Sequence, residues 1–110
     1  MEKIEKPWGY EELIEVNDFY VVKKLFMKNG QRCSLQYHNE KLETVTVLKG
    51  ILTLLIDDRI RNLTPFETMT ISPRTHHRMM ANDGDCLYME SSTNQLDDVV
   101  RLEDDYGRNT

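Results

Sequence analysis

Residues 43–63 read ETVTVLKGILTLLIDDRIRNL, and this stretch decides the fold class. Thr and Val alternate within Glu43–Lys49 (ETVTVLK), which is the two-residue period of a β-strand with one buried face. Ile51–Ile56 continues with strand-like composition, and the Asp57–Asp58 pair that follows is typical of a turn. Ile60–Leu63 then returns as another strand. Strand, turn and strand thus follow one another without a helical period.

The same pattern of short strands and turns extends in both directions. Six more strands are predicted, at Leu13–Val16, Phe19–Met27, Gln31–His38, Met69–Ser72, His77–Ala81 and Cys86–Ser91. Asn29–Gly30 has the composition of a hairpin turn, and Asn82–Asp85 that of a turn between the last two strands. About eight to ten short strands in one small chain indicate an all-β sandwich or barrel. We expect a single domain over residues 1–110.

Charge and hydropathy exclude two kinds of partner. The net charge is −5 and Lys23–Lys24 is the only adjacent basic pair, so no nucleic acid is expected to bind. The N-terminus is charged, and the longest apolar run, Val45–Ile56, is too short to span a bilayer, so no signal peptide and no membrane contact are predicted. Cys33 and Cys86 lie in apolar runs and are expected as buried free thiols in a reducing cytoplasm. A cytoplasmic protein is therefore expected.

Several polar side chains occupy strand faces that apolar residues usually fill. Within Gln31–His38, Gln36 and His38 share one face, which suits either solvent or a polar barrel lumen. Glu43 shares its face with two valines, where a buried carboxylate needs a partner or a metal, but it also fits an exposed mouth. His77 shares a face with Met79 and Ala81, and this position is compatible with a core histidine, a surface histidine or a metal ligand. If a barrel brought these four side chains together, they would suit Zn²⁺, Mn²⁺, Fe²⁺, Co²⁺ or Ni²⁺.

Four stretches of the sequence carry recognisable motifs. They are Lys6–Gly9 (KPWG), Gly30–His38 (GQRCSLQYH), Ile71–Arg78 (ISPRTHHR) and Asp98–Arg108 (DVVRLEDDYGR). Together, and in this order, they resemble the cupin domain of type II mannose-6-phosphate isomerases. The resemblance implies a double-stranded β-helix barrel of the cupin or jelly-roll type, a metal site in its lumen and a homodimer. It also implies that one divalent metal, most typically zinc, is bound by four residues: Gln36, His38, Glu43 and His77.

The sequence also departs from the family pattern. Asn39 and Glu40 stand where many members continue a run of histidines, which makes Glu40 an alternative to Gln36 as a ligand. Thr75 replaces a usual glycine, and Lys6 replaces an arginine with a planar fork. These departures keep open a non-catalytic module that binds a sugar or sugar nucleotide, and another metal-cupin activity such as an oxygenase.

The activity that the resemblance implies is the interconversion of mannose 6-phosphate and fructose 6-phosphate, or a related sugar-phosphate step in carbohydrate metabolism and polysaccharide biosynthesis. A proton carrier is needed, and Lys23 and Glu90 are the candidates, although Lys23 also fits a surface position. Arg78 is the candidate for holding the phosphate, yet strict alternation turns it outward if the preceding histidine faces the metal. Arg101 and Arg108 are expected either to close over the mouth or to form a salt-bridged tail.

Overall fold

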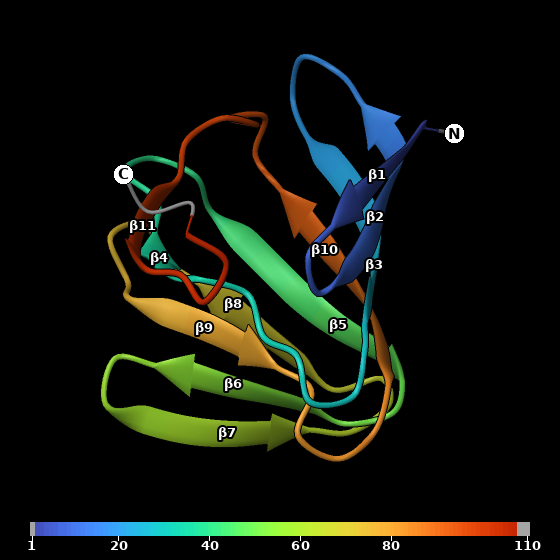
Figure 1. The fold of residues 1–110 in the computed structure, drawn as a ribbon. Helices are drawn as coiled ribbons and strands as arrows, with labels where there is room; N and C mark the ends of the chain where they lie inside the picture. Colours follow the sequence, from blue (N-terminus) through green and yellow to red (C-terminus); the bar gives the residue numbers. More distant parts are fainter. Residues whose placement is uncertain (1, 108–110) are drawn as a thin grey trace.

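The computed structural model describes residues 2–107, and this part of the chain contains only strands, turns and loops (Figure 1). The strands are β1 (Glu2–Lys6), β2 (Gly9–Val16), β3 (Val21–Met27), β4 (Leu35–Tyr37), β5 (Glu43–Lys49), β6 (Leu52–Ile56), β7 (Arg59–Leu63), β8 (Thr68–Ile71), β9 (His77–Met80), β10 (Cys86–Ser92) and β11 (Val100–Glu103). No helix long and apolar enough to cross a membrane occurs among the described residues.

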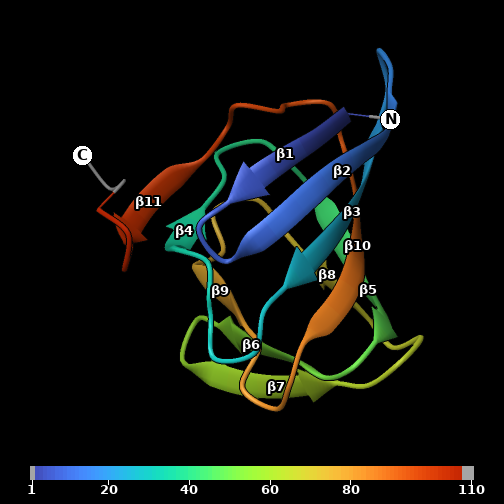
Figure 2. The ribbon, with the colours of Figure 1, turned by 45° about the vertical axis from the view of Figure 1, so that its right-hand side comes forward.

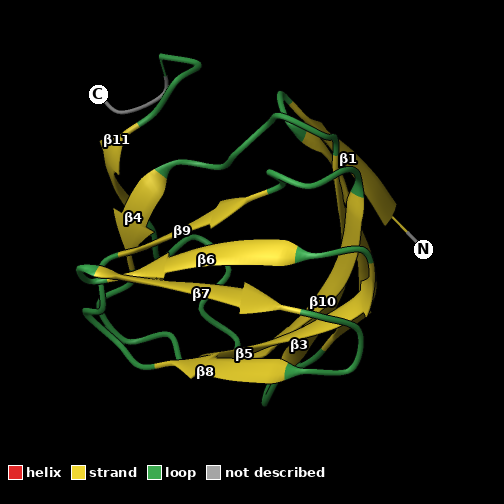
Figure 3. Cartoon of the chain, turned by 90° about the horizontal axis from the view of Figure 1, so that it is seen from below, coloured by secondary structure: helices red, strands yellow, loops and turns green. Residues whose placement is uncertain are grey.

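The strands form two antiparallel sheets that face each other (Figure 3). One sheet has the order β1-β2-β3-β10-β5-β8 and the other has the order β11-β4-β9-β6-β7. The chain passes repeatedly from one sheet to the other, which is the winding of a double-stranded β-helix. The predicted all-β barrel of the jelly-roll type is therefore confirmed.

The predicted strand positions differ from the structure mainly where the chain changes sheets. The Asn29–Gly30 turn was predicted as a hairpin, but β3 and β4 lie in different sheets. The predicted Asn82–Asp85 turn does follow β9 and precede β10, and these two strands also lie in different sheets. The predicted strand Gln31–His38 shrinks to Leu35–Tyr37 because the residues before it make the crossing. Gly50 makes another crossing, from β5 to β6, at φ +84°, where an added Cβ would lie 2.3 Å from the Asp85 carbonyl oxygen. β1 and β11 were not predicted.

The inward faces of β3, β10 and β5 change from apolar to polar along the strands. Toward one end lie Leu25, Tyr88 and Val47, which the register places side by side and which we call the apolar end. Toward the other end lie Lys23, Glu90 and Glu43, which we call the polar end. All six are buried, because the two-residue period of each strand keeps them on the lumen side. The polar end positions the candidate site.

Candidate metal centre

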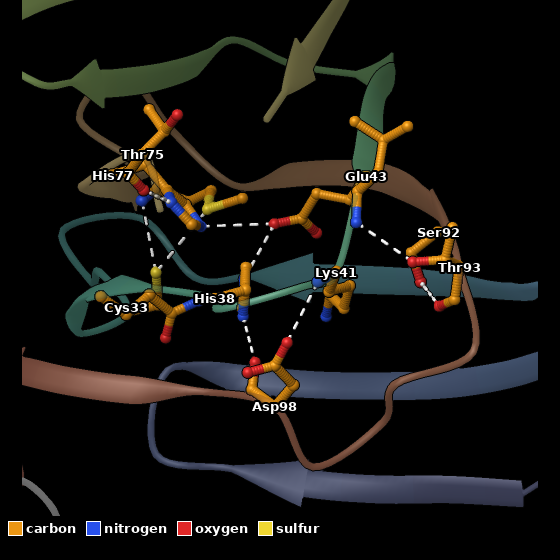
Figure 4. Close-up of polar contacts among 12 residues, drawn as sticks. Cys33, His38, Lys41, Glu43, Thr75, His77, Ser92, Thr93 and Asp98 are labelled. Atoms are coloured by element: carbon orange, nitrogen blue, oxygen red, sulfur yellow. Dashed lines mark hydrogen bonds and ion pairs between the residues drawn. The ribbon is translucent and has the colours of Figure 1, made fainter. Parts of the chain in front are cut away.

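Two histidines and a glutamate meet inside the barrel (Figure 4). His38 follows β4, Glu43 begins β5 and His77 begins β9. Their exposed fractions are 3%, 1% and 0%, so the alternative that Glu43 lies at an exposed mouth is wrong. The Glu43 Oε1 atom lies 3.1 Å from His38 Nε2 and 3.3 Å from His77 Nε2. Two positions five residues apart, His38 and Glu43, and the distant His77 therefore present their ligand atoms to one point.

Main-chain oxygens determine which nitrogen of each histidine faces Glu43. His38 Nδ1 donates to the carbonyl oxygen of Asp98, and His77 Nδ1 donates to that of Thr75 at 2.8 Å. A carbonyl oxygen only accepts, so the hydrogen-bond network assigns the proton to Nδ1 in both rings. In the neutral imidazoles, both Nε2 atoms then carry a lone pair directed at the carboxylate.

This arrangement of acceptors fits a cation. Glu43 Oε2 and His77 Nε2 are buried and lack a hydrogen-bond partner among the described residues. Burial tends to raise the pKa of Glu43, but without a bound cation the hydrogen bonds from His38 and His77, once Nε2 also carries a proton, and the nearby Lys41 outweigh it and hold the pKa well below its usual range. Donors bound to one ion at about 2.0–2.2 Å are separated by roughly 3.0–3.4 Å, the spacing seen between Glu43 and each imidazole. Carboxylate and imidazole are also the donors that zinc and its neighbours prefer.

The fourth predicted ligand, Gln36, lies next to this group. It is the register partner of His77 across β4 and β9, so the two side chains share the lumen face. Its Oε1 accepts a hydrogen bond of 2.7 Å from Ser34 Oγ. Glu40 is exposed and is not part of the His-Glu-His cluster. The position of Gln36 thus favours it over Glu40, and its role as a ligand stays a prediction.

A cavity of about 420 Å³ opens beside His38 and contains both predicted proton carriers. Lys23 and Glu90 line it and are register partners across β3 and β10. Lys23 Nζ lies 3.5 Å from Glu11 Oε1, so it is ion-paired inside the barrel and does not lie on the surface. Burial and the nearby Glu43 carboxylate raise the pKa of Glu90 to about 8. A carboxyl group that titrates near neutral pH can both give and take a proton.

Arg78 is placed outside this cavity. It is 4% exposed, and its Nε donates to the Cys33 carbonyl oxygen at 2.8 Å. Its Nη2 donates to Asp105 Oδ1 at 2.9 Å. The outward orientation that strict alternation predicts is therefore found, and no bulge returns Arg78 to the lumen. Arg108 lies outside the described residues.

Several cavity residues were not predicted. Glu11, from β2, is 8% exposed and holds Lys23, while Trp8 packs into the core and lines the cavity. Lys41, in the loop between His38 and Glu43, is 7% exposed and also lines it. The KPWG motif was a signal for Trp8, but Glu11 and Lys41 carry no sequence signal because their inward position depends on how the segments pack together.

Comparison with known sequences identifies similar proteins. Residues 1–104 match the family described as mannose-6-phosphate isomerase C-terminal. A mannose-1-phosphate guanylyltransferase of Escherichia coli strain K12 and the alginate biosynthesis protein AlgA of Pseudomonas aeruginosa are each 32% identical over 111 residues. Each match covers 96% of this chain and 23% of the relative, so the chain spans about a quarter of the length of these curated relatives.

Several solved structures share the fold of this chain although their sequences differ from it. An RmlC-like cupin from Shewanella frigidimarina superposes with a TM-score of 0.78 at 13% identity, covering 87% of this chain and 86% of that one. A sugar phosphate isomerase of the cupin superfamily from Silicibacter pomeroyi has a TM-score of 0.68 at 19% identity, covering 78% of this chain and 59% of that one. The fold is therefore a cupin double-stranded β-helix.

Proposed function

The chain belongs to the mannose-6-phosphate isomerase C-terminal family, and from this premise we propose that it is a metal-dependent isomerase of a sugar phosphate. Mannose 6-phosphate and fructose 6-phosphate are the substrate pair to test first. The observation that carries the proposal is the buried pair of imidazole lone pairs that faces the Glu43 carboxylate beside a cavity. Two similar proteins support it: a mannose-1-phosphate guanylyltransferase among the relatives and a sugar phosphate isomerase among the structural neighbours.

The metal would be held by His38, Glu43 and His77, with Gln36 as the proposed fourth ligand. When bound, a divalent metal supplies a Lewis acid that polarises the oxygens of the sugar. The chain itself fixes the ligand atoms before binding, because the Asp98 and Thr75 carbonyl oxygens orient the two imidazoles.

Glu90 is the better of the two proton carriers. Aldose–ketose isomerisation removes a proton from carbon 2 of the open-chain aldose and returns one to carbon 1, while a proton passes from the carbon 2 hydroxyl to the carbon 1 oxygen. With its pKa raised to about 8, Glu90 is populated in both protonation states near neutral pH. Lys23 lies 3.5 Å from Glu11, which Lys6 also approaches at 4.0 Å, and its proposed role is to stabilise negative charge on a sugar oxygen.

The test is a coupled isomerase assay on protein loaded with Zn²⁺, Co²⁺ or Mn²⁺. We expect turnover of mannose 6-phosphate that a chelator abolishes and metal restores. Glu90→Gln should lower kcat by about 100-fold or more while leaving bound metal unchanged, because it removes the proton carrier. Asp58→Asn, in the exposed β6–β7 turn, is the matched control and should retain activity. A metal-loaded protein that binds the sugar phosphate without turnover would instead be a binding module.

A further inference from the structure

Four basic side chains line the cavity of a chain whose net charge is −5: Lys6, Lys23, Lys41 and Arg101. Lys6 and Lys23 share the Glu11 carboxylate, at 4.0 and 3.5 Å. Among the described residues, neither Lys41 nor Arg101 lies within ion-pair distance of a carboxylate, although the charge of Lys41 acts on Glu43 and Glu90 from farther away. Lys41 is buried and Arg101 half-buried, and such a cation without a direct partner is unfavourable, so these two side chains are candidates for binding an external anion.

Arg101 reaches the lumen from β11. It is the register partner of Gln36, which is in turn the register partner of His77, so the three lie in a line across β11, β4 and β9. Neighbouring strands are about 4.8 Å apart, which separates the Arg101 and His77 backbones by roughly 10 Å. The Nε of Arg101 is buried and lacks a hydrogen-bond partner in the part of the chain that the structure describes.

Lys41 lies in the loop between His38 and Glu43 and lines the same cavity as Arg101. Its backbone N–H donates to Asp98 Oδ2 at 3.0 Å (Figure 4). The backbone N–H groups of Asn39 and Glu40 donate to the same carboxylate. Asp98 precedes Arg101 by three residues, within the segment that crosses from β10 to β11 (Figure 2). One segment therefore anchors the Lys41 loop and carries Arg101 into the cavity.

We infer that Lys41 and Arg101 form an anion subsite that takes the phosphate group of the sugar substrate; the inference rests on the proposed function for the identity of that substrate. A phosphate group accepts charge-assisted hydrogen bonds from both side chains, and arginine offers a planar fork for two of its oxygens. In an open-chain hexose 6-phosphate the phosphate lies at the opposite end from the carbonyl carbon. A phosphate subsite separate from the metal centre is what such a molecule requires. Arg78, which is held by Cys33 and Asp105, is not needed for this role.

The experiment compares binding of three probes to zinc-loaded protein by titration calorimetry: mannose 6-phosphate, mannose and inorganic phosphate. We expect the wild type to bind mannose 6-phosphate far more tightly than mannose and to bind inorganic phosphate competitively. Arg101→Gln and Lys41→Met should each weaken both phosphate-bearing probes by about tenfold or more, since each removes a charged partner. Arg101→Lys should recover part of the loss, and zinc content should be unchanged throughout.

Arg59→Gln is the matched control, because it removes one positive charge from the exposed β7 strand. Unchanged affinity in both subsite variants, or a loss as large in the control, would overturn the subsite. A wild type that binds neither phosphate-bearing probe would also overturn it. Affinity that depends on Lys41 and Arg101 in a protein without turnover would sustain the subsite and refute the isomerase. Turnover in a protein whose affinity for the phosphate-bearing probes does not depend on Lys41 or Arg101 would support the isomerase and refute the subsite.

Discussion

The apolar and polar ends of the lumen are built from the same three strands, and they differ in what they contribute. On β3 only Lys24 separates Leu25 from Lys23, and on β10 only Met89 separates Tyr88 from Glu90. The apolar end removes large side chains from water, which stabilises the fold. The polar end buries carboxylates and a lysine, which is unfavourable unless they are paired or bind a cation. Two residues along the same strand are therefore enough to pass from side chains that stabilise the fold to side chains that serve the proposed site.

The largest expected effect comes from Glu43→Gln, at the polar end. Losing the central carboxylate should weaken metal binding by more than the roughly 100-fold that loss of an outer-shell partner costs. In metal-free protein at alkaline pH, with both imidazoles neutral, the same change should leave the free energy of unfolding unchanged or higher, because a charged acceptor no longer faces two lone pairs. Metal titration and urea unfolding of the apo protein measure the two quantities. A clear loss of apo stability would contradict the division between the two ends.

The converse change is Leu25→Ala, at the apolar end. Leu25 is 3% exposed, and a buried leucine replaced by alanine loses about 2–5 kcal/mol of stability, depending on how far the cavity collapses. Metal affinity per folded molecule should change little, because Leu25 contacts no ligand atom. Urea unfolding with metal titration of the folded fraction tests both. If the metal affinity falls together with the stability, the two ends are not separable.

Asp105→Asn tests whether Arg78, which follows the proposed ligand His77, stabilises the fold and does not contribute to metal binding. Hydrogen bonds from Arg32 and Arg78 hold the pKa of Asp105 below its ordinary value of 3.8. The carboxylate therefore stabilises the fold above about pH 4, and this contribution is lost as pH falls through the lower folded-state pKa. The variant should have a lower urea midpoint than wild type at pH 7, and the gap should narrow near pH 3. Metal affinity at pH 7 should stay the same.

The smallest expected effect concerns the two cysteines. Burial raises the pKa of Cys33 to about 12 and that of Cys86 to about 11. At pH 8 only about one Cys33 thiol in ten thousand is then a thiolate, so alkylation of folded protein should be negligible. Mass spectrometry after iodoacetamide treatment, with and without urea, checks this. Rapid labelling of Cys33 in the native protein would show that the cavity admits reagents to the core.

Strand periodicity predicted much of this arrangement. It placed Glu43 on the face of Val45 and Val47 and turned Arg78 away from His77, because a pleated strand alternates its side chains whatever its tertiary context. It did not predict the burial of Glu43 or the inward position of Lys41, which depend on segments far away in the sequence.

The crossing at Asn29–Gly30 was mistaken for a hairpin turn because crossings and hairpins use the same turn residues. The identity of the metal, the role of Gln36 as a ligand and the homodimer stay predictions.

The carbonyl oxygens that orient His38 and His77 have an evolutionary consequence. Both belong to the main chain, at Asp98 and Thr75, and every amino acid carries that oxygen. Side-chain replacement at these two positions therefore leaves the acceptor itself in place, provided that the backbone keeps its path. Thr75, where the sequence departs from the family motif, is such a replacement. The orientation of the imidazoles is thus robust to mutational drift, and selection on this part of the site acts on the path of the backbone.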